Sequence, residues 1–142
     1  MQIQLAVLCD AATDYSGKLN LLGTFDTLIT SHLPAIHPQC SIAIRLTFQK
    51  TEEGKHVLQM NFVDEDGRSV MNPLEMHLEV SVPDDTIFLS RNAVITLQNM
   101  TLAKAGLYSI EISVDGVRHT SIPLLVKLMS VTPGTPHPFG QG

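Results

Sequence analysis

The sequence predicts an all-β protein, a single antiparallel β-sandwich of about seven to nine strands. Apolar and polar residues alternate along most of the chain with the period of two that is typical of half-buried strands. Turn pairs such as Asp66-Gly67 and Asp115-Gly116 separate these runs, as in hairpins. No segment has the period of an amphipathic helix, so the pattern favours strands throughout.

The N-terminal run "MQIQLAVLCD" predicts the first strand. A bacterial lipoprotein signal is the alternative, but no basic residue precedes the apolar run and Leu8 stands where a small residue is required. The next segment, "GKLNLLGTFDTLIT", is apolar on both sides, which predicts a central strand with Gly23 at a bulge or a close contact. "SHLPAIHPQ" then predicts a proline-containing loop whose histidines, His32 and His37, are solvated.

The later strands define the predicted core. Their apolar faces contribute the residues expected to be buried, namely Leu46, Phe48, Leu58, Met60, Phe62, Leu78, Ile110 and Ile112. Pro123 cannot donate a backbone hydrogen bond, which predicts an edge, a bulge or an outward-facing position in the final strand. The domain is expected to span residues 1–128, and residues 129–142, rich in Pro and Gly, to form a mobile tail.

The stretch "AGLYSIEISVDG" resembles the tyrosine corner of immunoglobulin-like domains, in which a tyrosine hydroxyl bonds to backbone a few residues upstream. It predicts that the Tyr108 hydroxyl lies within hydrogen-bonding distance of residues 102–105. It also predicts that Gly106 is needed because the chain bends tightly there and a side chain would crowd the ring. Ile110 stands where antibody-type domains have their second cysteine, and the chain has no Trp. The resemblance therefore implies the broader immunoglobulin-like sandwich.

Two longer phrases are similar to an uncharacterised family of small bacterial proteins. They are "LNLLGTFDTLITSHLP", residues 19–34, and "FLSRNAVITLQNMTLAKAGLYSIEISVDG", residues 88–116. This family has no assigned activity, so the resemblance implies a fold and no chemistry.

Composition excludes several classes of partner. The net charge is -5 and the nine Lys and Arg are scattered, which argues against nucleic acid and against a membrane surface. Cys9 and Cys40 are too few for a disulfide framework and are expected to be reduced core thiols in a cytoplasmic protein. The expected partner is another protein, and the chain is expected to be a monomer or a weak homo-oligomer.

One surface offers a candidate for metal or acid-base chemistry. Glu75, His77 and Glu79 alternate on the exposed face of one strand, and Glu111 and His119 hold comparable positions in the last hairpin. If their strands share a sheet, the five side chains could converge on a divalent cation, as in a small metal-dependent enzyme or ligand-binding domain. The alternative is a solvated sheet surface, which has the same pattern and is the interpretation that we favour.

Arg91 and Asn92 are polar residues at the entrance of an apolar strand. They satisfy backbone groups in the structural interpretation, and Arg91 faces a ligand at the sandwich rim in the functional one. No serine-hydrolase elbow or Gly-rich phosphate loop occurs, and no catalytic residue or cofactor is predicted. The sequence thus favours a non-catalytic binding or assembly module that acts through loops or an open sheet edge.

Overall fold

The computed structural model describes residues 1–129, which form nine strands and one 3-10 turn, Lys50–Glu52. The all-β prediction is confirmed for this part of the chain. The strands are β1 Gln2–Tyr15, β2 Lys18–Phe25, β3 Thr27–Thr30, β4 Ala35–Gln49, β5 Gly54–Val63, β6 Leu74–Val80, β7 Phe88–Leu102, β8 Gly106–Val114 and β9 Val117–Leu128.

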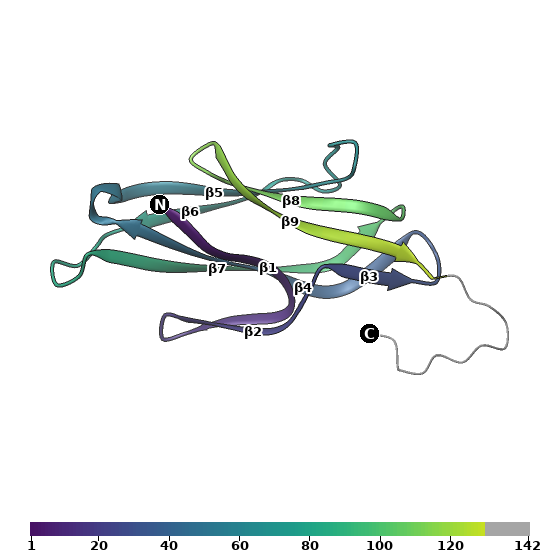
Figure 1. The fold of residues 1–142 in the computed structure, drawn as a ribbon, viewed down its shortest axis with the longest axis horizontal. Coiled ribbons are helices and arrows are strands. Elements are labelled where there is room, and N and C mark those ends of the chain that lie inside the picture. Colours follow the sequence, from purple (N-terminus) through teal and green to yellow (C-terminus); the bar gives the residue numbers. More distant parts are fainter. Residues whose placement is uncertain (130–142) are drawn as a thin grey trace.

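The strands form two sheets that face each other (Figure 1). The first has the order β2-β1-β4-β7 and the second the order β3-β9-β8-β5-β6. All pairings are antiparallel except that of β3 with β9, which is parallel. Asp115 and Gly116 form the predicted tight turn between β8 and β9, both with positive φ (52° and 80°).

The core lies between the sheets and confirms the predicted strand phases. All eight residues expected to be buried are at most 4% exposed: Leu46, Phe48, Leu58, Met60, Phe62, Leu78, Ile110 and Ile112. Inward positions of β5, β6 and β8 alternate with outward ones, so each of these strands buries one apolar row, whereas β4 is buried on both faces from Cys40 to Ile44.

The second half of β1, from Ala11 to Tyr15, and the strand β2 cover part of the outer face of the first sheet. β1 pairs with β4 only up to Cys9, and from Ala11 onward it pairs with β2 alone. The side chain of Arg45 on β4 donates a hydrogen bond to the carbonyl oxygen of Gly17 at the tip of this hairpin. This cover explains why Ala43, on the outer face of β4, is fully buried.

The segment predicted as one central strand is instead two edge strands, β2 and β3, each at the end of a different sheet. The chain crosses between the sheets at Asp26, whose carbonyl oxygen accepts a hydrogen bond from the Leu125 amide. Gly23 is a close contact, as predicted, because a Cβ there would lie 2.4 Å from Asp10 Oδ2. Apolar residues on both sides of this segment predict burial on both faces, but Leu22 is 69% exposed. The apolar pattern alone therefore does not distinguish a central strand from an edge strand.

The predicted proline loop is shorter than expected, because β4 begins at Ala35 and contains His37. His32 is exposed as predicted, but His37 is not solvated: it is partly buried, with its ring centre 5.7 Å from that of Phe25. Pro38 is tolerated in this strand because β1 pairs with β4 only between Ser41 and Thr47. At Pro38, β4 has no partner strand on the side of β1, so the missing amide hydrogen breaks no strand pairing there.

Pro123 lies where β9 still has an open side, as predicted. β9 runs without a break from Val117 to Leu128, and its pairing with β3 begins only at Leu125. The predicted tail, apart from Met129, lies outside the described residues. Residues 1–129 contain no helix with the length and apolarity that crossing a membrane requires.

Candidate functional site

Four strands stand at the ends of the two sheets, and β7 differs from the other three. β3 has only four residues, β2 begins with a lysine, and β6 carries Glu75, His77 and Glu79. β7 has 15 residues, and from Asn92 to Leu102 it contains no charged residue, histidine or proline. Charges, proline and short length are the usual means of protecting an edge from pairing, so β7 is the least protected edge in the described residues.

An apolar groove runs beside the second half of β7. It has a volume of about 360 Å³ and lies between β7 and the segment that leads into β6. The apolar lining residues are Val70, Met71, Leu74, Ile95, Leu97 and Met100, and the polar ones are Thr96, Gln98, Asn99 and Thr101. No charged side chain lines the groove.

The groove opens into the hydrophobic core at the gap between the two sheets. Leu97 and Met100 are buried core residues, whereas Ile95 and Leu74 are only partly buried. Asn99 has a positive φ of 52°. Before it the odd-numbered residues of β7 face inward, and after it the even-numbered residues do. Pro38 is opposite Asn99 and the pairing keeps its register on both sides, so both strands change face together.

Arg91 closes the same gap at the other end of β7. Its Nη1 donates a hydrogen bond to the carbonyl oxygen of Glu79 on β6 at 2.7 Å. The two sheets are thus connected near the start of β7 and separated near its end. This contact agrees with the structural interpretation of Arg91, in which the side chain satisfies a backbone group.

Asn92 holds the β1–β2 hairpin over the first sheet. Its Nδ2 lies 2.9 Å from Asp14 Oδ2 and 3.2 Å from the Gly17 carbonyl oxygen. Its Oδ1 accepts a hydrogen bond from Arg45 Nη1 at 2.8 Å. Every polar atom of the side chain therefore has a partner within the chain, and the residue has a clear structural role.

The structure brings together only part of the predicted Glu and His surface. His77 Nε2 lies 3.1 Å from Glu75 Oε1 on the exposed face of β6. Glu111 on β8 forms an ion pair with Arg118 at 2.6 Å. Glu79 is exposed at the edge of β6, and His119 lines a different hollow, at the end of the sandwich. Within residues 1–129, no three His, Cys, Asp or Glu side chains are placed to hold a metal ion.

His56, which is partly buried, forms an ion pair with the exposed Asp115 that the sequence did not suggest. Its Nδ1 lies 2.6 Å from Asp115 Oδ2, and its Nε2 lies 2.6 Å from the carbonyl oxygen of Glu52. Both partners are acceptors, so this geometry favours the cationic ring, in which both nitrogens carry hydrogen. The bonds to Glu52 and Asp115 raise the pKa of His56, and the bond to His56 lowers the pKa of Asp115. No sequence signal links residues this far apart.

The two cysteines are buried, free thiols without nucleophilic character. Burial raises the pKa of both, that of Cys40 to about 11. A protonated thiol is a poor nucleophile, so neither residue suits covalent catalysis at neutral pH.

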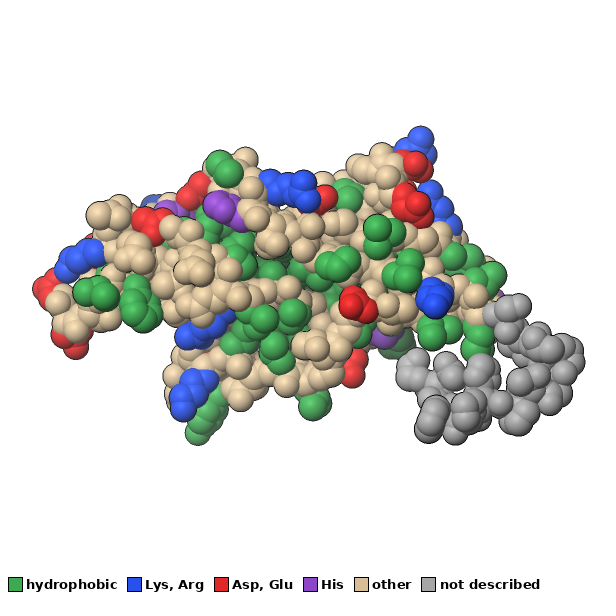
Figure 2. Space-filling model, viewed as in Figure 1, with side chains coloured by type: hydrophobic (Ala, Val, Ile, Leu, Met, Phe, Trp, Pro, Cys, Tyr) green, Lys and Arg blue, Asp and Glu red, His purple; other side chains and the backbone are tan. Residues whose placement is uncertain are grey.

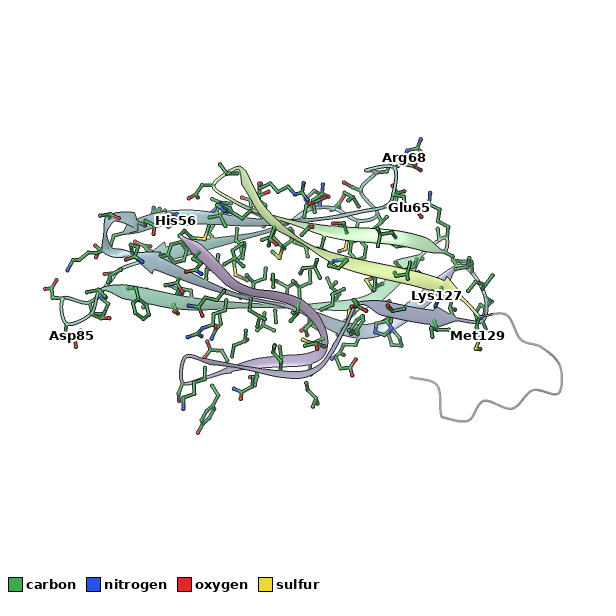
Figure 3. The ribbon with its side chains drawn as sticks, in the orientation of Figure 1. His56, Glu65, Arg68, Asp85, Lys127 and Met129 are labelled. Atoms are coloured by element: carbon green, nitrogen blue, oxygen red, sulfur yellow. The ribbon has the colours of Figure 1, made fainter. Side chains whose placement is uncertain are left out.

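The charged side chains have no single-sign patch on the face shown in Figure 2, where acidic and basic groups are dispersed. Figure 3 places His56 and Asp85 at one end of the sandwich and Glu65 and Arg68 at the other. The uncharged β7 edge and its groove are therefore the feature of the described residues best suited to bind another molecule.

None of the curated proteins matches this chain. Residues 4–127 match a protein family described as "Family of unknown function (DUF6941)". Because this match covers most of the 142 residues, the chain belongs to the family of unknown function DUF6941, in agreement with the resemblance to an uncharacterised family.

Proposed function

We propose that this protein is a non-catalytic binding module that takes up an extended protein segment along the free edge of β7. The observation that carries the proposal is the combination of an uncharged edge strand with an apolar groove beside it. The edge offers unpaired backbone N–H and C=O groups, which bind any extended chain. The groove accepts alternate side chains, which gives the interaction its selectivity.

The lining of the groove determines what the bound segment must look like. Charged side chains would lose their hydration there without gaining a partner, so the segment is uncharged along the groove. The groove follows β7 from Ile95 to Thr101, a length of roughly 23 Å at 3.3 Å per residue. A strand of six or seven residues with apolar side chains at alternate positions fits this length.

The strand order supports an immunoglobulin-like architecture, which we include in the proposal. In constant-type immunoglobulin domains one sheet has the order A-B-E-D and the other contains C, F and G. The rows β1-β4-β7 and β5-β8-β9 follow A-B-E and C-F-G. Tyr108, at the start of β8 in the F position, bonds to backbone upstream as a tyrosine corner does.

The comparison with constant-type domains also indicates which strand position beside β7 is empty. Strand D of the constant-type order pairs with strand E, which corresponds to β7. Between β6 and β7 the chain has only the connection 81–87, and no strand of the described residues pairs with the outer edge of β7. The bound segment would occupy the position of strand D.

A photo-crosslinking amino acid at Thr96, an exposed residue of β7 beside the groove, tests the proposal. The matched control carries the same group at Thr24, an exposed threonine on β2 at the opposite edge of the same sheet. Irradiation in a lysate of the native host should give a defined protein adduct from position 96 and none from position 24. Equal labelling from both positions, or none from either, would contradict binding at the β7 edge.

A further inference from the structure

We infer that the segment added to β7 is the β7 strand of a second copy of this chain, in an antiparallel arrangement about a two-fold axis. The inference rests on the proposed function, because both use the same edge and groove. It names the partner, which the proposed function leaves open.

The first argument is that β7 itself has the properties the groove requires. Asn92 to Leu102 is extended and uncharged, and Ala93, Ile95 and Leu97 occupy alternate inward positions. A two-fold pairing of this segment with itself is centred on Leu97. Every side chain of the paired segment then faces an uncharged one, so no charge is buried without a partner.

The second argument is that the pairing covers the partly exposed apolar residues. Around a centre at Leu97, residues 95–101 of one copy lie opposite residues 93–99 of the other. Ile95 of the added strand, which is only partly buried in its own copy, then lies beside the groove, whereas Ala93 and Leu97 stay in their own core. Ile95 and Leu74, which are only partly buried in one chain, gain apolar neighbours.

The third argument is the complementary charge at the ends of the paired segment. Arg91 precedes it, and Lys104 follows it with two acidic neighbours, Asp66 at 3.4 Å and Asp64 at 3.8 Å. These three groups carry one net negative charge. An antiparallel arrangement brings Arg91 of each copy toward this acidic group of the other copy, which favours the arrangement at both ends.

Other segments of this chain fit the edge less well. β2 and β6 carry charged residues, and β3 has only four residues. The C-terminal sequence contains Pro133, Pro136 and Pro138, which lack the amide hydrogen that strand pairing requires.

Analytical ultracentrifugation of the full chain tests the inference, with Thr96→Lys as the variant and Thr24→Lys as the matched control. Wild type and Thr24→Lys should show twice the 15.5 kDa mass of one chain. Thr96→Lys should weaken the dimer by about tenfold or more, because it places two like charges in the seam. An equimolar mixture of Thr96→Lys and Thr96→Glu should restore the dimer. An unchanged circular dichroism spectrum would show that the variants are folded, while loss of the dimer lowers the melting temperature by mass action.

The outcomes separate the inference from the proposed function. A monomeric wild type whose position 96 crosslinks to a different protein would overturn the inference and leave the proposed function standing. A dimer that survives Thr96→Lys would also overturn the inference, because the copies would then meet at another surface. A monomer without any adduct from position 96 would overturn both.

Discussion

The hydroxyl of Tyr108 donates a hydrogen bond to the carbonyl oxygen of Lys104 at 2.6 Å and accepts one from the Lys104 amide at 3.4 Å. The tyrosine ring contacts Phe62 edge to face, with the ring centres 5.9 Å apart. This confirms the prediction that the hydroxyl bonds to backbone between residues 102 and 105. The side chain joins the connection after β7 to the core, where it determines how the chain enters β8.

Tyr108→Phe should destabilise the fold without changing its structure. The ring stays in place and the hydroxyl is lost, so we expect a loss of about 0.5–1.5 kcal/mol in the free energy of unfolding, measured in urea. Tyr15→Phe is the control, because Tyr15 is 72% exposed and should change the stability little. Equal effects of the two substitutions would show that the hydrogen bond contributes nothing.

Gly106 lies at a tight bend, as predicted, but the group that a side chain there would meet is not the predicted one. Its φ of 137° is strained for other residues, and an added Cβ would lie 1.9 Å from Glu65 Oε1, not against the tyrosine ring. Glu65 Oε1 accepts a hydrogen bond from the Leu107 amide at 3.1 Å, so moving this carboxylate breaks that bond. The glycine thus leaves room for a contact between the β5–β6 connection and β8.

Gly106→Ala should therefore cost more stability than Gly54→Ala. Gly54 has a similar φ of 128° with open space around it, so its substitution measures the backbone strain alone, about 1–3 kcal/mol. Gly106→Ala adds the lost bond to Glu65, about 1 kcal/mol more. Urea unfolding of both variants gives the comparison. Equal losses would mean that Glu65 moves aside freely.

Strand phases could be predicted from the sequence because the period of two acts within each strand. The eight core residues were identified in this way. Strand neighbours could not be predicted, because they depend on contacts between distant segments. For this reason the sequence predicts one central strand where the structure has β2 and β3, and it indicates the two polar residues at the entrance of β7 but not that this strand has an open edge. The pair of His56 with Asp115 was missed for the same reason.

Truncating a buried core side chain should lower the free energy of unfolding, as its burial in the structure predicts. Ile112 is fully buried between the sheets, so Ile112→Ala should cost about 2–5 kcal/mol from lost contacts and the cavity left behind. Leu22→Ala is the control, because that side chain is 69% exposed. Urea unfolding measures both. A small loss at Ile112 would contradict the strand phase of β8.

Cys9 and Cys40 should not react with a thiol reagent in the folded protein. Both are fully buried, and burial raises the pKa of Cys40 to about 11, so thiolate is scarce near pH 8. After unfolding in guanidinium without reductant, both thiols should react. Absorbance of the released chromophore counts them in each state. Thiols that appear only after reduction would mean that the cysteines are oxidised.

Stability should depend on pH through His56. The bonds to Glu52 and Asp115 raise its pKa in the folded state above the unfolded value of about 6.5. The protonated ring therefore stabilises the fold fully below about pH 6.5, and this contribution is lost as the pH rises through the folded pKa. Asp115 acts in the opposite direction: its pKa is lowered, so its contribution is lost only when the pH falls through the acidic range.

His56→Gln should remove this dependence, since glutamine does not titrate. The free energy of unfolding of the wild type should decline as the pH rises above about 6.5, and that of the variant should decline less. His77→Gln is the matched control, because the His77 side chain is 76% exposed beside Glu75 and should leave the wild-type decline in place. An NMR titration of the His56 ring measures its pKa directly. A value at or below 6.5 would contradict a cation held between the Asp115 carboxylate and the Glu52 carbonyl.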